Sequence, residues 1–274
     1  MQTNKIYCGD CIEMLKSNRV RARLIFADPP FNIGYKYNKY KDRLNYDEYV
    51  DWTEEWMDAC CSSLTDDGSF YVAIGDEYAA EVKMTARKLN LHTRNWIIWH
   101  YGFGQNTVRK FGRSHTHILY FVKNCDNFIF NDADIRIPSE RQLRYADKRA
   151  DSRGRIPGDV WKYSRICGTF SERVSWHTCQ MPLRLMARII KASSNQGDLV
   201  LDPFSGSAST LAAAAVLGRE YLGFDIDEKY AAKGQKRIEE IVASEVTYID
   251  DKDTCMQPPS RSTRRNDNNQ QLLF

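Results

Sequence analysis

Short apolar segments alternate with longer amphipathic segments along this chain, and no other feature of the sequence constrains the fold as strongly. The expected strands are residues 4–8, 22–27, 68–74, 94–100, 117–122, 198–201 and 220–224. The expected helices are residues 47–64, 77–89, 182–192, 209–217 and 227–243. Pro182 is predicted at the first helical position of its segment, a position that favours proline. Alternating strands and helices predict an α/β fold with a doubly wound, mostly parallel sheet.

The tetrapeptide Asp28-Pro29-Pro30-Phe31 directly follows the apolar run 24–27. It is therefore expected at the carboxyl end of a buried strand, where ligands of α/β sheets bind. Two consecutive prolines donate no N–H and fix φ, which leaves the Asp28 carboxylate and the neighbouring carbonyls as hydrogen-bond acceptors. Phe31 adds a flat apolar face. A site of acceptors beside an aromatic ring suits an exocyclic amino group on a planar ring, such as that of a nucleobase.

A second motif, Asp-Pro-Phe-Ser-Gly-Ser-Ala-Ser, occupies residues 202–209 between an expected strand and an expected helix. Small residues at such a turn let the backbone approach a bound nucleoside, although similar turns also use Gly and Ser for geometric reasons alone. Asp225 follows Asp202 by 23 residues and ends the next strand, a position suited to ribose hydroxyls. The chain lacks GxxxxGK[ST] and a full GxGxxG, so a nucleoside without phosphates, such as S-adenosylmethionine, fits best.

With 274 residues, of which 42% are apolar, the chain can bury a large core. It has neither a long uncharged apolar run nor a basic, apolar leader, so no membrane span and no secretory signal is predicted. Eight scattered cysteines fit a reducing compartment, which makes the cytoplasm the expected location. The pattern Cys8-Gly9-Asp10-Cys11 has no second cysteine or histidine pair at zinc-ligand spacing, so no metal site is predicted.

A basic segment from Arg136 to Arg165 contains nine Lys or Arg residues against four acidic ones, a net charge of +5. The whole chain has a formal net charge of only +3. Gly154 and Pro157-Gly158 interrupt the segment, as in an inserted region. Such a segment is suited to contact with a polyanion, and a solvated loop with surplus charge is the alternative.

The tetrapeptide and the segment 202–207 together resemble the amino-group DNA methyltransferases of bacterial restriction-modification and orphan systems. The order of motifs is that of their beta class, with the catalytic motif first, a target-recognition region in the middle and the cofactor loop last. Further matches within residues 4–243 stand at 8–13, 95–99, 113–115, 157–161 and 177–183. Two positions depart from the family's pattern: Ala208 replaces a usual glycine, and Met181 replaces a usual lysine.

The resemblance implies a Rossmann-like sheet with circularly permuted motif order and an inserted target-recognition region. The implied division is a catalytic half at 1–124, the insertion at 125–176 and a cofactor-binding half at 177–249. Residues 250–274 are expected to be disordered because they are rich in Pro, Arg, Asn and Asp. Bacterial or phage-encoded members of this family act on double-stranded DNA, are often dimers, and can work beside a separate cognate restriction endonuclease.

The implied reaction transfers a methyl group from S-adenosylmethionine to N6 of an adenine flipped out of the duplex. Phe31 would stack on the base, while Asp28 and the carbonyl of Pro29 would accept hydrogen bonds from its amino group. Cytosine N4 is the nearest alternative, although family members that modify it more often carry Ser at the position of Asp28. A subunit that has lost catalysis is another, supported only by Ala208 and Met181. The absence of a Pro-Cys nucleophile motif argues against methylation at cytosine C5.

The resemblance also implies roles for further residues. The cofactor-binding residues are predicted to be Asp10, Cys11, Asp202, Phe204, Ser205, Gly206, Ser207 and Asp225. The substrate-binding residues are predicted to be Asn32, Tyr35, Lys36, Arg113, Ser114 and His115. Asp10 has an alternative role as a helix N-cap, because Glu13 follows it at capping-box spacing. Likewise, the loop 32–47 could be an ordinary polar surface loop, and residues 113–115 could serve only as a strand edge.

Overall fold

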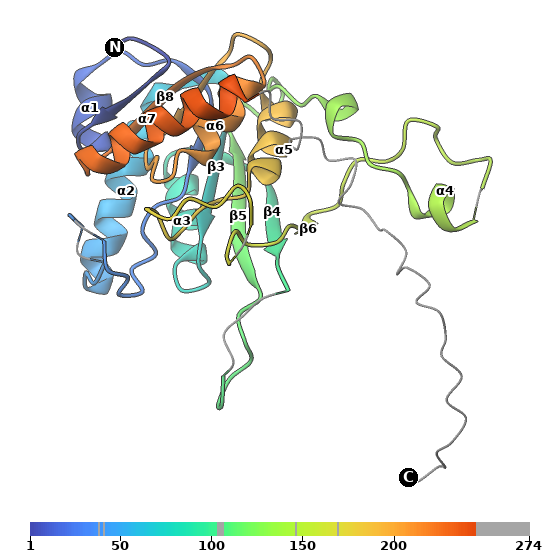
Figure 1. Ribbon diagram of the computed structural model, residues 1–274, viewed down its shortest axis with the longest axis horizontal. Helices are drawn as coiled ribbons and strands as arrows, with labels where there is room; N and C mark the ends of the chain where they lie inside the picture. The colour runs from blue at the N-terminus through green and yellow to red at the C-terminus, as the bar shows by residue number, and fades with distance from the viewer. Residues whose placement is uncertain (38, 41, 103–106, 146, 169, 245–274) are drawn as a thin grey trace.

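A single mixed sheet runs through the protein (Figure 1). The computed structural model describes residues 1–244 apart from 38, 41, 103–106, 146 and 169. The strands are β1 (Lys5–Cys8), β2 (Ala22–Ala27), β3 (Leu64–Ile74), β4 (His92–His100), β5 (His115–Val122), β6 (Val160–Lys162), β7 (Leu199–Asp202) and β8 (Glu220–Asp225). Their order is β1-β8-β7-β2-β3-β5-β4-β6. Among these strands β5 is antiparallel to both neighbours, and the remaining pairs are parallel.

Helices cover both faces of the sheet. They are α1 (Cys11–Ser17), α2 (Tyr46–Ser63), α3 (Ala79–Lys88), α4 (Glu140–Tyr145), α5 (Leu183–Ser193), α6 (Ser209–Val216) and α7 (Glu228–Ala243), with a 3-10 turn, η1, at Asp132–Ile135. Buried side chains of α1, α2 and α3 form one core cluster, and those of α5, α6 and α7 form the other. Along β2, Leu24 and Phe26 belong to the second cluster while Ile25 and Ala27 belong to the first. Burial on both faces explains why this strand is a continuous apolar run, and the predicted doubly wound fold is confirmed.

The centre of the sheet brings the two sequence motifs together. β2 pairs in parallel with β7, and Leu24 and Ile25 lie opposite Val200 and Leu201. The chain winds outward from β2 through β3 in one direction and from β7 through β8 in the other. Ligands of doubly wound sheets bind at such a switch point, outside the carboxyl ends of the strands. The Asp28 tetrapeptide and the 202–209 motif therefore share this edge.

Some boundaries differ from the expected ones. Pro182 is the N-cap of α5, with ψ 133°, so the prediction that it occupies the first helical position is wrong. β3 begins at Leu64, directly after α2, and is longer than expected at its start. The short elements α4, β6 and η1 were not predicted, and α1 was anticipated only through the alternative role of Asp10 as a helix N-cap, which is confirmed. They are short, and β6 is an edge strand with only its central residue partly buried, so hydrophobic periodicity gives little signal.

The inserted region contributes η1, α4 and β6. Figure 1 shows α4 on a segment that projects from the main body, whereas β6 returns to the sheet and pairs with β4. The division into halves at 124 and 177 stays a prediction, and one sheet contains strands from each part. The predicted disordered tail, 250–274, lies outside the described residues. In the portion of the chain that the structure describes, helices fall short of the length and apolarity needed to span a bilayer.

Candidate active site

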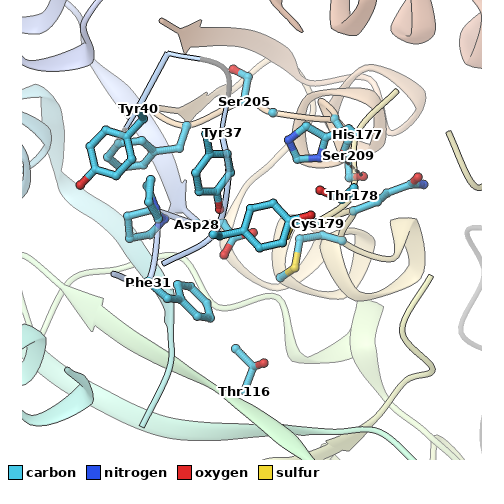
Figure 2. A pocket seen from close by; sticks show the side chains of 18 of the residues that line it. Asp28, Phe31, Tyr37, Tyr40, Thr116, His177, Thr178, Cys179, Ser205 and Ser209 are labelled. Atoms are coloured by element: carbon cyan, nitrogen blue, oxygen red, sulfur yellow. Dashed lines mark hydrogen bonds between the residues drawn. The ribbon is translucent and has the colours of Figure 1, made fainter. Parts of the chain in front are cut away.

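A cavity of about 730 Å³ opens at the carboxyl edge of the sheet. Two loops form opposite parts of its lining: the β2–α2 loop (residues 28–45) and the β7–α6 loop (residues 202–208). All four predicted catalytic residues and all eight predicted cofactor-binding residues line it. Figure 2 shows Asp28, Phe31 and Tyr37 together, with Ser205 and Ser209 also drawn along the pocket. The structure thus assembles both motifs around one space.

Three carboxyl groups share this cavity and have raised pKa values. Burial raises the pKa of Asp28 to about 8, and the charge of Asp202 adds to the rise. Burial also raises the pKa of Asp202 to about 7 and that of Asp225 to about 6. Burial in a low-dielectric site disfavours the ionised form of all three. A positively charged ligand bound beside these carboxyl groups would favour the ionised form instead.

The first part of the β2–α2 loop is held by one buried carboxylate. Asp42 is 2% exposed. Its oxygens accept hydrogen bonds from the backbone N–H groups of Asn32 (2.7 Å), Ile33 (3.2 Å) and Tyr35 (2.7 Å). Asn32 has φ 57°, in the left-handed region that Asn tolerates better than most residues. No local pattern in the sequence singled out Asp42, because its partners are backbone groups.

A residue of α2 holds the tetrapeptide in place. The hydroxyl of Tyr49, which is 1% exposed, donates to the carbonyl of Pro30 at 2.6 Å. This carbonyl is thus used by the fold, which leaves the Asp28 carboxyl as the polar side chain that the tetrapeptide presents to the cavity. Gly75, just after β3, lies close to Phe31: an added Cβ would stand 3.3 Å from its ring. The phenyl ring is therefore confined at the cavity wall.

Backbone N–H groups of the β7–α6 loop donate to acceptors at the end of β8. The N–H of Ser205 donates to Phe224 O at 2.8 Å, and the N–H of Gly206 donates to an Asp225 oxygen at 3.0 Å. Gly206 has φ 46°, and an added Cβ would lie 2.9 Å from the imidazole of His177. Only glycine fits this position without displacement, both by conformation and by space. The loop therefore forms a narrow backbone cradle beside two carboxyl groups.

The two departures from the family's pattern are both accommodated. Ala208 adopts φ 61° as the N-cap of α6 and is fully buried. Its methyl group fits because Gly234 of α7 faces it, where an added Cβ would stand 3.1 Å away. Met181 is 8% exposed and belongs to the core cluster beneath α5. The cavity at this point is therefore lined by a thioether in place of a positive charge.

Asp10 and Cys11 combine structural and cavity positions. Asp10 is the N-cap of α1, where its carboxylate accepts from the N–H groups of Ile12 and Glu13, and it also lines the cavity. Burial raises the pKa of the Cys11 thiol to about 12, so the thiol stays protonated. Cys8 and Cys11 are free thiols. Among the described residues no cluster of three or more His, Cys, Asp and Glu side chains is arranged for a metal ion.

Residues 177–179 match the family's pattern, but no role was predicted for them. His177, Thr178 and Cys179 all line the cavity. The Nδ1 atom of His177 is buried without a hydrogen-bond partner. Burial, with the positive charge of Arg237, lowers the pKa of this imidazole to about 4, so it is neutral. The hydroxyl of Tyr37 forms a hydrogen bond with the Cys179 side chain. These two side chains lie next to Asp28 in the pocket (Figure 2).

The predicted substrate-binding residues divide into two groups. Those that line the cavity are Tyr35, Arg113 and His115; those outside its lining are Asn32, Lys36 and Ser114. The Asn32 amide instead ties the loop together, donating to Leu44 O and to the Tyr78 hydroxyl. Ser114 O accepts from the N–H of Tyr101, a strand-edge role. DNA contact stays a prediction for all six residues.

The basic segment of the insertion is exposed but partly neutralised. Arg149 pairs with Asp147 and Arg153 pairs with Asp151, at 2.9 and 3.0 Å, within the segment itself. The other cations of the segment that are exposed are Arg141, Arg144, Lys148, Arg155, Lys162 and Arg165. Of these, Arg165 reaches the cavity lining and lies over the Tyr101 ring. The segment thus presents positive charge beside the site and contributes one cation, Arg165, to the cavity lining.

Comparison with known proteins gives this architecture a family. The family model described as DNA methylase, for N6 and N4 methyltransferases, matches residues 22–236. The type II methyltransferase M.HpaI of Haemophilus parainfluenzae is 32% identical over 237 residues, covering 86% of this chain and 74% of that protein. The DNA adenine methyltransferase YhdJ of Escherichia coli K12 is 32% identical over 247 residues, covering 87% and 83%.

Solved structures agree on the fold. The M1.HpyAVI complex with S-adenosylmethionine aligns with a TM-score of 0.63 at 20% identity, covering 85% of this chain and 98% of that one. The cytosine-N4-specific PvuII DNA methyltransferase aligns with a TM-score of 0.62 at 18% identity, covering 88% and 91%. At these identities the likeness concerns the fold alone. The matched family model and the two relatives carry the conclusion that the chain belongs to the S-adenosylmethionine-dependent DNA methyltransferases that modify exocyclic amino groups.

Proposed function

We propose that this protein transfers a methyl group from S-adenosylmethionine to N6 of an adenine flipped out of double-stranded DNA, at a specific site. The observation that carries the proposal is the convergence of the Asp28 carboxyl, the Phe31 ring and the β7–α6 loop on one cavity. A base-modifying enzyme needs a pocket that receives the extruded base beside its co-substrate. The two loops, on adjacent parallel strands, supply the two sides of such a pocket.

The cavity fits the cofactor in size and charge. Its volume of about 730 Å³ lies within the range of small-molecule sites. The narrow cradle at Gly206 and the carboxyl groups of Asp202 and Asp225 suit a nucleoside with ribose hydroxyls and a positive charge. Ser205, Ser207 and the unpartnered Nδ1 of His177 add polar groups. When bound, S-adenosylmethionine supplies the electrophilic methyl group.

The residues of the β2–α2 loop would act on the base. Phe31 would stack on the ring, and the Asp28 carboxylate, with the carbonyl of Pro29, would accept hydrogen bonds from the amino group. These bonds orient the nitrogen and favour its lone pair as nucleophile. Once ionised, Asp28 is placed to accept the proton that the nitrogen loses. In the protein without ligand the pKa of Asp28 is about 8, so the carboxyl group is mostly protonated at neutral pH. The positive charge of a bound cofactor would lower this pKa and favour the ionised form that this role requires.

Adenine is proposed over cytosine because the tetrapeptide begins with Asp28. The relative YhdJ, an adenine methyltransferase by name, supports the same assignment. A subunit without catalysis is less well supported, because Ala208 and Met181 both fit the fold and Asp28 and Asp225 both face the cavity. A homodimer and a separately acting restriction endonuclease remain proposals that follow from the resemblance.

The test is transfer of labelled methyl groups to plasmid DNA, followed by nucleoside analysis and single-molecule sequencing. We expect N6-methyladenine within one short sequence. N4-methylcytosine would overturn the choice of base. Calorimetry with S-adenosylmethionine separates an active enzyme from a subunit without catalysis: retained DNA affinity with no cofactor binding would refute the proposed activity.

A further inference from the structure

A basic projection beside the cavity carries the two most exposed large apolar side chains among the described residues. We call residues 107–114, which lead into β5, the β4–β5 finger. Phe111 is 101% exposed and Val108 is 99% exposed. Figure 1 shows the segment that leads into β5 extending beyond the rest of the sheet. Neither side chain is buried against the described residues, and two such side chains near each other on one projection mark a candidate interaction surface.

The charges of the finger favour a polyanion as its partner. Arg109 and Lys110 are exposed and lie between Val108 and Phe111 in the sequence. Thr107 and Lys110 also line the cavity, so the finger continues directly from the proposed site. Cations that flank exposed apolar side chains are suited to a duplex, whose phosphates attract the cations and whose base steps accept the apolar groups.

The root of the finger is firmly attached to the sheet. Tyr101, 5% exposed, donates its N–H to Ser114 O and its hydroxyl to His115 O, both at 2.9 Å. Arg113 forms ion pairs with Asp76 at 2.5 Å and with Glu77 at 2.7 Å. These contacts extend the β4–β5 ladder and fix the finger to the end of β3. The exposed tip therefore projects from a defined base.

The root also lies next to the ring proposed to stack on the target base. An added Cβ on Gly75 would lie 3.3 Å from Phe31 and 3.9 Å from Arg113. Phe31 and the finger root are thus separated by little more than one backbone segment. A duplex that delivered a base to Phe31 would have its neighbouring base steps beside the finger.

We propose that Phe111 is a wedge that enters the base stack of the duplex next to the extruded base. This inference rests on the proposed function. Extruding a base costs unstacking and unpairing, and an aromatic ring that occupies the opened step offsets part of this cost. Val108 provides a second apolar contact, and Arg109 and Lys110 hold the flanking phosphates. Phe111 is accordingly a positioning residue that does not touch the reacting atoms.

The test compares Phe111→Ala with the wild type on two short duplexes that carry the methylated sequence mapped on plasmid DNA. In one duplex the target base is normally paired; in the other it faces an abasic position, so extrusion is easier. We expect Phe111→Ala to lower kcat/KM on the paired duplex by about tenfold or more. On the abasic duplex the variant should stay within about twofold of the wild type, because the cost that the wedge offsets has been removed.

A second measurement does not depend on turnover. With 2-aminopurine at the target position, the fluorescence increase that reports extrusion should be smaller for Phe111→Ala than for the wild type. Phe130→Ala is the matched control, because Phe130 is another exposed phenylalanine (40%) and lies outside the cavity lining. Its rates should equal those of the wild type. Since Phe111 makes no packing contacts, Phe111→Ala should unfold at the wild-type temperature.

Several results would overturn the wedge. Equal losses on both duplexes, an unchanged rate on the paired duplex, or an unchanged 2-aminopurine signal would each do so. A change of oligomeric state in Phe111→Ala would assign the finger to contact with a second copy of the chain. If the wild type methylates neither duplex nor plasmid DNA, the proposed function fails and the wedge fails with it. If the wild type is active and Phe111→Ala has the same kcat/KM as the wild type on both duplexes, only the proposed role of Phe111 is refuted.

Discussion

The two loops that enclose the cavity begin at neighbouring strand ends but are held in place by different means. The β7–α6 loop is short and is held by the adjacent end of β8: the N–H of Ser205 donates to Phe224 O, and the N–H of Gly206 donates to the carboxylate of Asp225. The β2–α2 loop is long and depends on buried side chains: Asp42 accepts three backbone N–H bonds, and Tyr49 supports Pro30.

The two loops are therefore expected to serve different steps, cofactor binding and methyl transfer. A loop of small residues approaches a ligand closely and tolerates little added volume. A loop supported by side chains can place a carboxyl and an aromatic ring, at the expense of needing distant residues to hold it. Substitutions in the β7–α6 loop should therefore change cofactor affinity, and substitutions that affect the β2–α2 loop should change methyl transfer.

Asp28→Ala should give the largest effect. Loss of the carboxylate removes the acceptor that orients the amino group, so we expect methyl transfer to fall by about 10³-fold or more. Affinity for S-adenosylmethionine, measured by calorimetry, should change far less than the rate, since Asp28 belongs to the other loop and influences the cofactor only through its charge. A retained transfer rate would refute the role of Asp28, and a matching loss of cofactor affinity would break the comparison.

The rate should also depend on pH through Asp28. Because burial raises the pKa of Asp28 to about 8, the required carboxylate forms only as pH rises toward 8 in the free enzyme. We expect kcat/KM to rise about tenfold per pH unit below this pKa and to level off above it. A flat profile between pH 6 and about 9 would contradict this pKa.

The same raised pKa values predict the opposite slope for stability. The fold favours the protonated carboxyl groups of Asp28, Asp202 and Asp225, so their stabilising contribution is full below their ordinary pKa of 3.8 and is lost as pH rises through about 6 to 8. The melting temperature of the protein without ligand should therefore fall between about pH 4 and pH 8. In Asp28→Asn the decline should be smaller, particularly near pH 8.

Gly206→Ala tests the β7–α6 loop. An added Cβ would stand 2.9 Å from His177, and alanine disfavours the φ of 46° at this position, so the cradle must shift. We expect cofactor affinity to weaken by about 10- to 100-fold, with the rate at saturating cofactor changing much less. Ala208→Gly is the control: it should leave affinity within about twofold and raise the free energy of unfolding by up to about 1 kcal/mol, because φ at 208 is also positive.

Asp42→Asn tests the loop supported by side chains, with a smaller expected effect. The amide cannot replace a carboxylate that accepts three N–H bonds, so we expect a loss of about 2–4 kcal/mol in the free energy of unfolding. Methyl transfer should fall while cofactor affinity is preserved. Asp47→Asn, at an exposed position in the first turn of α2, is the control and should be neutral. Loss of cofactor affinity in Asp42→Asn would mean that the two loops are not independent.

Much of the site could be predicted because its residues stand in local patterns. Asp28 and Asp202 each follow an apolar strand directly, and Asp225 ends the next one. Such positions are recognisable from periodicity alone. Asp42 and Tyr49 could not be predicted, because their partners are backbone groups 10 and 19 residues away along the chain. For Asn32, the predicted contact with DNA is joined by a structural role that no sequence pattern indicated.

The α/β class, the family and the two motifs follow from the amino-acid sequence alone, since each depends on the identity and spacing of neighbouring residues. The pairing of β2 with β7, which brings the motifs to one cavity, is visible only in the folded chain. The same holds for the raised pKa values of the three carboxyl groups and for the exposure of Phe111. Burial and proximity arise from contacts between distant segments, which local patterns do not encode.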